Sequence, residues 1–169
     1  MRNVKTKRVV SFVAASSNSG KTTLIEKVVR VLKGRGLHVA VIKHASAGFD
    51  LDKPGKDSWR FQQAGADTVI LSGPGSVALM QKIEYEPTLD ELARLAGDAD
   101  IVIAEGFKKK VKNRIEVFRQ GVSGEHPLSL NDPSFLALVS DKPFDVSIPC
   151  FDLNDAAGVA DLIARTIAL

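Results

Sequence analysis

The chain has 169 residues, 44% of them hydrophobic and 25% charged, with a formal net charge of +3 and one cysteine, Cys150. This length predicts a single domain over residues 1–169, and the lone cysteine excludes an internal disulfide. No apolar run reaches the roughly 20 residues that span a bilayer, and the basic residues are not interleaved with aromatic ones, so we expect a cytoplasmic protein that binds neither membrane nor nucleic acid.

The first part of the chain predicts a strand followed by a helix. Residues 9–15 form an almost continuous apolar run, as expected of a strand buried on both faces. The helix that follows carries one apolar stripe and ends near Gly34 and Gly36. The stripe consists of Leu24, Ile25, Val28, Val29 and Leu32. Further along, Thr88 and Glu91 have the spacing of a capping box and predict the start of another helix.

Apolar runs and helical patterns alternate along the rest of the chain. The further predicted strands are 37–42, 68–71, 100–104, 135–139 and 147–151. Residues 114–119 alternate polar and apolar side chains, which suits an edge strand or a hairpin, and residues 77–83 suit a short hairpin. A last helix begins after Asn154 or Asp155. The order predicts an α/β fold with a mostly parallel twisted sheet, helices on both faces and a small hairpin excursion.

Residues 15–23, Ala-Ser-Ser-Asn-Ser-Gly-Lys-Thr-Thr, have most features of a phosphate loop. Small residues let the backbone curl until successive N–H groups point at one anion, and the next helix adds its positive dipole end. Lys21 would contact the β- and γ-phosphates, and the Thr22 hydroxyl would bind Mg²⁺. Ala15 replaces the first glycine of the pattern, which is tolerable only if its φ is not positive. The loop predicts a P-loop NTPase fold with the nucleotide-binding residues Ser17, Asn18, Ser19, Gly20, Lys21, Thr22 and Thr23.

Polar side chains follow several predicted strands, at the edge where open α/β sheets bind ligands. Glu105 follows the strand at 100–104, so its carboxylate is a candidate for holding Mg²⁺ and orienting water. Lys21 and Glu105 are therefore the candidate catalytic residues. Lys43 is a candidate contact for a phosphate or an acidic substrate group, with His44 beside it. Asp141 follows the strand at 135–139, where a carboxylate would accept N1–H and N2–H of guanine; a turn aspartate is the alternative.

Two charged segments supply further candidates. Asp52 is a candidate second contact for Mg²⁺ and Asp57 an alternative, although either would also serve to cap a helix beginning near Ser58. Lys56 lies in the same segment. Lys108 opens a run of lysines that is either a solvated loop or an anion-binding flap.

Six stretches of the chain together match the pattern of one known family. They are 15–24, 42–44 (Ile-Lys-His), 50–58 (Asp-Leu-Asp-Lys-Pro-Gly-Lys-Asp-Ser), 64–66 (Ala-Gly-Ala), 105–108 (Glu-Gly-Phe-Lys) and 140–141 (Ser-Asp). They cover most of the chain, and it resembles the molybdopterin-guanine dinucleotide biosynthesis adaptor (MobB) family. The resemblance implies a homodimeric GTP-binding protein with weak GTPase activity that assists the guanylyltransferase attaching GMP to molybdopterin. Ser46-Ala47 stand where the family often has two histidines, so any role of those histidines is altered or missing here.

The leading hypothesis is a GTP-binding accessory factor of molybdenum cofactor biosynthesis that uses Mg²⁺ and is at most a slow GTPase. Its candidate partners are a guanine nucleotide, the molybdenum cofactor guanylyltransferase and molybdopterin itself. The second hypothesis is a small-molecule kinase that transfers a γ-phosphate to a metabolite, with Arg114 and Arg119 as the only lid arginines available. A metal-delivery GTPase is disfavoured by the scarcity of His and Cys, and a non-enzymatic scaffold with a relict loop is a fourth alternative. The residues alone do not choose between GTP and ATP.

Overall fold

The computed structural model describes residues 8–46, 48–49, 52–107 and 111–167. The chain divides into two compact units, one formed by Met1–His44 with Thr88–Leu169 and the other by Ala45–Pro87. We call them the sheet unit and the hairpin unit. The expectation of one domain over 1–169 stays a prediction. Within the described residues, no helix is long and apolar enough to cross a membrane.

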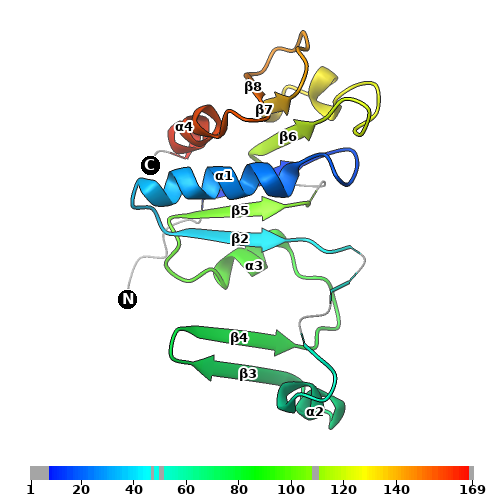
Figure 1. Ribbon diagram of the computed structural model, residues 1–169, viewed down its shortest axis with the longest axis vertical. Helices are drawn as coiled ribbons and strands as arrows, with labels where there is room; N and C mark the ends of the chain where they lie inside the picture. Colours follow the sequence, from blue (N-terminus) through cyan, green and yellow to red (C-terminus); the bar gives the residue numbers. More distant parts are fainter. Residues whose placement is uncertain (1–7, 47, 50–51, 108–110, 168–169) are drawn as a thin grey trace. The chain divides into compact units, whose positions relative to one another are not determined.

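The sheet unit contains a six-stranded sheet in the order β2-β5-β1-β6-β7-β8, and every neighbouring pair is parallel (Figure 1). Its strands are β1 (Val9–Val13), β2 (Val39–Lys43), β5 (Ile101–Glu105), β6 (Arg114–Phe118), β7 (Phe135–Ser140) and β8 (Cys150–Asp152). This architecture confirms the predicted α/β class. Since parallel strands run in the same direction, their carboxyl ends meet at one edge, where Lys43, Glu105 and Asp141 follow or end their strands.

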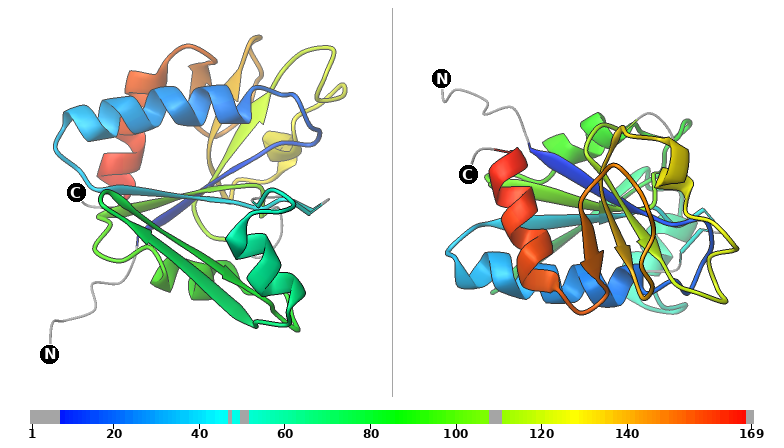
Figure 2. Two further views of the ribbon diagram at one scale, coloured as in Figure 1. Left: turned by 60° about the horizontal axis from the view of Figure 1, so that its bottom comes forward. Right: turned by 90° about the horizontal axis from the view of Figure 1, so that it is seen from above.

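Helices cover both faces of this sheet. On one face, α1 (Lys21–Gly34) contacts α4 (Ala156–Thr166), whereas α3 (Leu89–Arg94) lies on the opposite face (Figure 2). A short 3₁₀ helix, η1 (Leu128–Asn131), follows β6. The capping box of α3 is present as expected: the Thr88 hydroxyl accepts from the Glu91 amide, and the Glu91 carboxylate accepts from the Thr88 amide.

The core of the sheet unit lies between the sheet and α1 with α4. Four of the five predicted stripe residues of α1 are buried, and Val29 is half-buried. The strand β1 is buried along nearly its whole length, as its apolar sequence predicts. Val10 and Phe12 of β1 are fully buried. The packed strand therefore fixes the position at which the phosphate loop begins.

The hairpin unit consists of α2 (Asp57–Gln63), β3 (Thr68–Gly73) and β4 (Ser76–Gln81). The strand predicted at 68–71 exists, but it pairs antiparallel with β4 in a separate two-stranded sheet. The hairpin predicted within 77–83 is instead formed by β3 and β4 together. The reason is the two-residue turn at Pro74-Gly75, because so short a connection can join only antiparallel strands.

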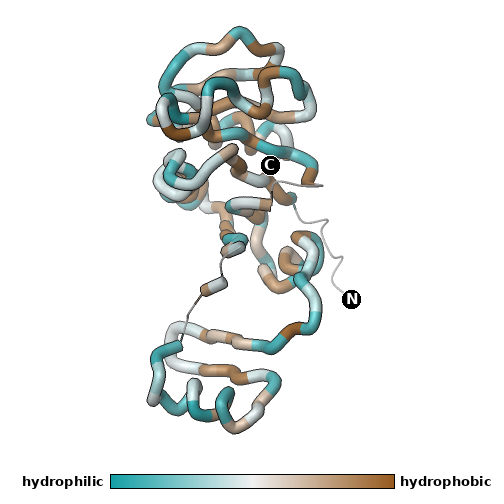
Figure 3. The backbone as a smooth tube through the Cα atoms, turned by 90° about the vertical axis from the view of Figure 1, so that its right-hand side faces the viewer, coloured by the Kyte–Doolittle hydropathy of each residue, from teal (hydrophilic) through white to brown (hydrophobic). Residues whose placement is uncertain are grey.

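The hairpin exposes an unusual amount of apolar surface. Ile70 and Leu79 lie opposite each other across the two strands and are 60% and 52% exposed, and Val77 is 70% exposed. In Figure 3, apolar stretches are visible along both strands of the hairpin unit. A lone two-stranded hairpin is at best marginally stable in water, and contiguous exposed apolar surface is a feature of interaction sites.

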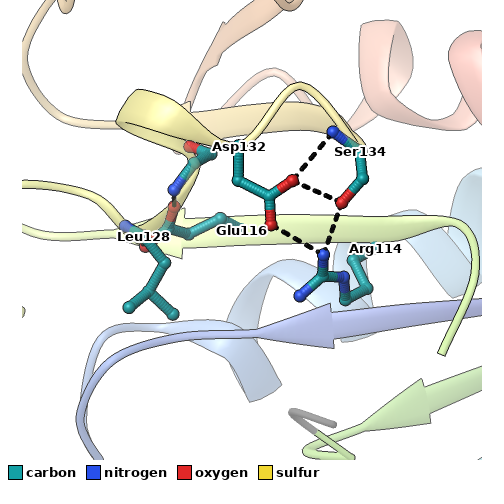
Figure 4. Close-up of polar contacts among 6 residues, drawn as sticks. Arg114, Glu116, Leu128, Asp132 and Ser134 are labelled. Carbon is teal, nitrogen blue, oxygen red and sulfur yellow. Dashed lines mark hydrogen bonds and ion pairs between the residues drawn. The ribbon is translucent and has the colours of Figure 1, made fainter. Parts of the chain in front are cut away.

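The expectation of an edge strand or hairpin at 114–119 is wrong. The strand β6 lies inside the sheet, paired with β1 on one side and β7 on the other. Polar side chains can lie inside the sheet here because groups from other segments form hydrogen bonds with them. The fully buried Glu116 accepts hydrogen bonds from the amides of Leu128 and Ser129, both at 2.8 Å (Figure 4).

Arg114 of the same strand is also held by protein groups. Its guanidinium donates to the carboxylate of Asp132 at 2.9 Å and to the hydroxyl of Ser134 (Figure 4). The guanidinium also lies 4.1 Å from the centre of the Phe135 ring. Hydrogen bonds from Ser134, followed by the contact with Arg114, hold the pKa of the Asp132 carboxyl below its usual value. A lid role for Arg114 in phosphoryl transfer would require breaking this network.

Glu116→Ala should lower the free energy of unfolding by about 3 kcal/mol, because the buried Ser129 amide and the part-buried Leu128 amide lose their acceptor. Equilibrium unfolding in denaturant measures the change. Glu125→Ala, an exposed carboxylate in the following loop, is the matched control and should change stability by less than about 0.5 kcal/mol. Equal effects of the two substitutions would contradict the role assigned to Glu116.

Candidate nucleotide-binding site

The phosphate loop connects the end of β1 at Val13 with the start of α1 at Lys21. Two of its residues have left-handed backbone conformations: Asn18 with φ 60° and Gly20, the N-cap residue, with φ 93°. Ala15 is not among the described residues with positive φ, so its methyl group introduces no backbone strain. The substitution of the first glycine is therefore compatible with the loop.

The backbone amides of this loop are available to an anion. No N–H from Ser17 to Gly20 donates to another residue in the described part of the chain. The first intrahelical hydrogen bond into the loop runs from the Leu24 amide to the Gly20 carbonyl at 3.0 Å. Free amides at the positive end of a 14-residue helix are an arrangement that suits an anion, so this loop is the candidate phosphate site.

Lys21 places its ammonium group over the same loop. Its Nζ donates to the carbonyl oxygen of Ser16 at 3.0 Å and to the hydroxyl of the buried Ser19 at 3.2 Å. The cation thus lies at the loop, where the protein's own oxygen atoms hold it in place.

A hydroxyl and a carboxylate meet beside the loop. The Thr22 hydroxyl lies 2.9 Å from Oε1 and 3.1 Å from Oε2 of Glu105, the last residue of β5. Lys43, at the end of β2, places Nζ 3.7 Å from Oε2 of Glu105. Thus the strand order brings Lys43 and Glu105 together as expected, although they lie 62 positions apart in the sequence.

His44 has a different environment from Lys43. Its amide donates to the carbonyl of Glu105 at 2.9 Å, and its ring lies 5.1 Å from that of Phe107. Gly106 has φ +99°, and a Cβ there would lie only 3.0 Å from the Cβ of His44. Glycine is therefore required at 106, because the two strand ends approach so closely.

A pocket of 440 Å³ opens next to the phosphate loop at the ends of β6, β7 and β8. Asp141 lines it, as the guanine hypothesis requires, and its Oδ1 accepts from the Gln120 amide at 2.9 Å. The full lining is Gly20, Thr23, Leu24, Lys27, Arg119, Gln120, Asp141, Asp152, Leu153 and Asn154. Of these, Lys27, Gln120 and Asp152 belong to no motif in the sequence, and the sequence suggests Arg119 only as a lid arginine of a kinase.

Asp52, Lys56 and Asp57 belong to the hairpin unit. Asp52 accepts from the amide of Lys53 at 2.9 Å and from the hydroxyl of Ser58 at 3.0 Å, and its other oxygen is buried without a partner among the described residues. The expectation that an aspartate side chain caps α2 is wrong, since the N-cap residue is Lys56 and it makes no side-chain cap. Their assignment as metal or phosphate contacts stays a prediction.

Lys108 lies outside the described residues, so its assignment also stays a prediction. Among the residues that are described, no three His, Cys, Asp or Glu side chains form a group able to hold a metal ion.

Comparison with known proteins gives a consistent family. Residues 9–141 match the family model described as molybdopterin guanine dinucleotide synthesis protein B. The molybdopterin-guanine dinucleotide biosynthesis adapter protein of Escherichia coli K12 is 38% identical over 158 residues, covering 90% of this chain and 89% of the relative. The Haemophilus influenzae protein of the same description is 36% identical, with 89% and 85% covered. A crystal structure of a molybdopterin-guanine biosynthesis protein B superposes with a TM-score of 0.74 at 32% identity, covering 94% of this chain and 99% of the other.

Proposed function

Because the chain belongs to the molybdopterin guanine dinucleotide synthesis protein B family, we propose that it binds GTP with Mg²⁺ and acts as an adaptor in the biosynthesis of molybdopterin-guanine dinucleotide. The observation that carries the nucleotide proposal is the loop of free amides before α1, with the Lys21 ammonium over it. The oxygens of a polyphosphate can accept hydrogen bonds from these amides, and its negative charge complements the Lys21 ammonium.

The charges in the pocket support a guanine base. The carboxylates of Asp141 and Asp152 line it together with the loop residue Gly20. A carboxylate only accepts hydrogen bonds, so it favours a base edge that presents donors. Guanine offers the adjacent donors N1–H and N2–H, whereas adenine presents an acceptor at N1. The pocket therefore favours GTP and GDP over ATP.

Thr22 and Glu105 provide a donor set that fits Mg²⁺. Both supply hard oxygen atoms, and these lie 2.9 Å apart beside the phosphate loop. When bound, the ion would neutralise charge on the β- and γ-phosphates. The Glu105 carboxylate, already oriented by the Thr22 hydroxyl and Lys43, would keep an attacking water in place. Slow hydrolysis is expected, because an arginine finger, worth about 10³–10⁵ in rate, is not part of this arrangement.

Calorimetric titration of GTP, GDP and ATP, each with and without Mg²⁺, tests this proposal. We expect GTP and GDP to bind about 5- to 150-fold more tightly than ATP, since a polar group left unpaired costs about 1–3 kcal/mol and every 1.4 kcal/mol changes Kd tenfold. Glu105→Gln should remove most of the Mg²⁺ dependence of GTP binding while leaving GDP binding in EDTA unchanged. Equal affinities for ATP and GTP would refute the guanine assignment, and no binding of any nucleotide would refute the site.

The adaptor proposal names the guanylyltransferase as partner, with molybdopterin as a further candidate ligand. It is supported by the family and by the names of the relatives. The decisive assay measures guanylyl transfer to molybdopterin by purified guanylyltransferase, with and without this protein and GTP. We expect stimulation by the wild type and none by Lys21→Ala. If the wild type and Lys21→Ala both stimulate guanylyl transfer, the adaptor role does not depend on nucleotide binding.

We also propose a homodimer. The exposed apolar side chains of the hairpin unit, among them Ile70, Val77 and Leu79, support a second protein surface covering them. Light scattering should give twice the mass of one chain. A monomer at micromolar concentration would contradict the homodimer proposal but would not bear on the proposed nucleotide site.

A further inference from the structure

Arg119 is an unpaired cation at the edge of the nucleotide site. It follows β6 directly, and its guanidinium makes no hydrogen bond or ion pair with any residue the structure describes. Arg114, at the other end of the same strand, is held by Asp132 and Ser134. An exposed arginine is ordinary by itself, so its surroundings decide whether it has a role.

The guanidinium of Arg119 lies against the phosphate loop. A Cβ built on Gly20 would be 3.9 Å from its Nη2, and both residues line the 440 Å³ pocket with Thr23. The carboxylates of Asp141 and Asp152 line the same pocket, yet neither forms an ion pair with it. The pocket thus has a free cation at the loop, whereas carboxylates occupy other parts of its wall.

The backbone around Arg119 is tied to the loop. Its amide donates to the hydroxyl of Ser123 at 3.0 Å, and its carbonyl accepts from the amide of Ser123 at 2.9 Å. The hydroxyl of Ser16, inside the phosphate loop, donates to the carbonyl of Val122 at 2.7 Å. These bonds limit how far the base of the Arg119 side chain can move from the loop.

The strand order places Arg119 and the metal candidates on opposite sides of the loop. The loop follows β1, which lies between β5, carrying Glu105, and β6, which precedes Arg119. The pocket next to Arg119 includes Gly20 and Thr23, whereas Thr22 contacts Glu105. If Thr22 and Glu105 mark the β- and γ-phosphates, then Arg119 lies at the end of the polyphosphate nearest the ribose.

We propose that Arg119 binds the α-phosphate of the guanine nucleotide and contributes equally to GTP, GDP and GMP binding. This inference rests on the proposed nucleotide-binding function. A guanidinium suits the role, because its fork of N–H donors matches phosphate oxygens and its charge is permanent. Arg119 is thus a binding residue for the nucleotide and leaves the hydrolysis step unaffected.

The test compares wild type, Arg119→Ala and Arg119→Lys, with Arg30→Ala, an exposed arginine on α1, as the matched control. Affinities for GTP, GDP, GMP and guanosine are measured by displacement of a fluorescent GDP, and single-turnover hydrolysis is measured at saturating GTP. For Arg119→Ala we expect a loss of about 10- to 100-fold, by the same factor for all three nucleotides. Guanosine binding and the hydrolysis rate should change less than about twofold, and Arg119→Lys should recover part of the affinity.

Each other outcome overturns the inference in a recognisable way. Unchanged affinities in Arg119→Ala would show that the guanidinium does not contact phosphate. A loss for GTP and GDP but not for GMP would move the contact to the β-phosphate. Slower hydrolysis with unchanged nucleotide affinity would show that Arg119 stabilises the transition state of hydrolysis. If the wild type binds no nucleotide, the proposed function itself fails, which is a separate result.

Discussion

Lys21→Ala should raise the Kd for GTP by about 100- to 1,000-fold. The ammonium group already lies over the phosphate loop, where it donates to Ser16 and Ser19. Each hydrogen bond to a charged group contributes about 1.5–3 kcal/mol, and every 1.4 kcal/mol changes Kd tenfold. Loss of two proposed phosphate contacts at the lower end of this range would cost about 3–4 kcal/mol, which gives the expected factor. Calorimetric titration with GTP and Mg²⁺ measures it.

Lys33→Ala is the matched control, because Lys33 lies in the last turn of the same helix, away from the loop. It should leave the Kd for GTP within about twofold of the wild type. Circular dichroism must show that Lys21→Ala retains its helices, since its own loop hydrogen bonds are lost. Wild-type affinity in a folded Lys21→Ala protein would mean that the loop amides alone bind the phosphates, and the role given to Lys21 would be wrong.

Asp141→Asn should convert a preference for GTP into a preference for XTP. In the proposed complex the carboxylate would accept two hydrogen bonds from guanine, whereas an asparagine amide also donates and so suits the 2-oxo group of xanthine. Sites built to hydrogen-bond a group discriminate strongly, because a mismatched polar group is left unpaired. We expect GTP affinity to fall about 100-fold and XTP affinity to rise by about tenfold or more.

The substitution is designed to preserve the local structure. The Asp141 oxygen that accepts from the Gln120 amide remains an oxygen in asparagine. Displacement of fluorescent GDP by GTP, XTP and ATP measures the three affinities on both proteins. Asp152→Asn gives a comparison from the same pocket. If only Asp152→Asn changes the base preference, Asp141 is not the residue that reads guanine.

The phosphate loop and its immediate neighbours could be predicted from sequence because they are local. Residues 15–23 are consecutive, and their geometry depends on small residues, one left-handed glycine and the start of a helix. Glu105 could be placed for a similar reason, since it ends an unbroken apolar strand. The order of elements also predicted a mostly parallel sheet.

Contacts between distant segments could not be predicted in this way. The strand 114–119 looked like an edge strand because its polar residues alternate, but Leu128 and Ser129 satisfy Glu116, which permits burial in the middle of the sheet. The hairpin of β3 and β4 is a different case, because its pairing is local. The run 68–71 alone does not show its partner, but the two-residue turn at Pro74-Gly75 does.

The sequence by itself determined a phosphate loop between a buried strand and an amphipathic helix, with a carboxylate at a neighbouring strand end. Only the tertiary structure decided which residues face that loop. The order of the six strands brings Glu105 to one side of it and Arg119 to the other, and it gathers Asp141 and Asp152 into one pocket. The physical reason is that strand order depends on hydrogen bonds between strands far apart in the sequence and on partners for buried polar groups. Neither leaves a periodic signal in the chain.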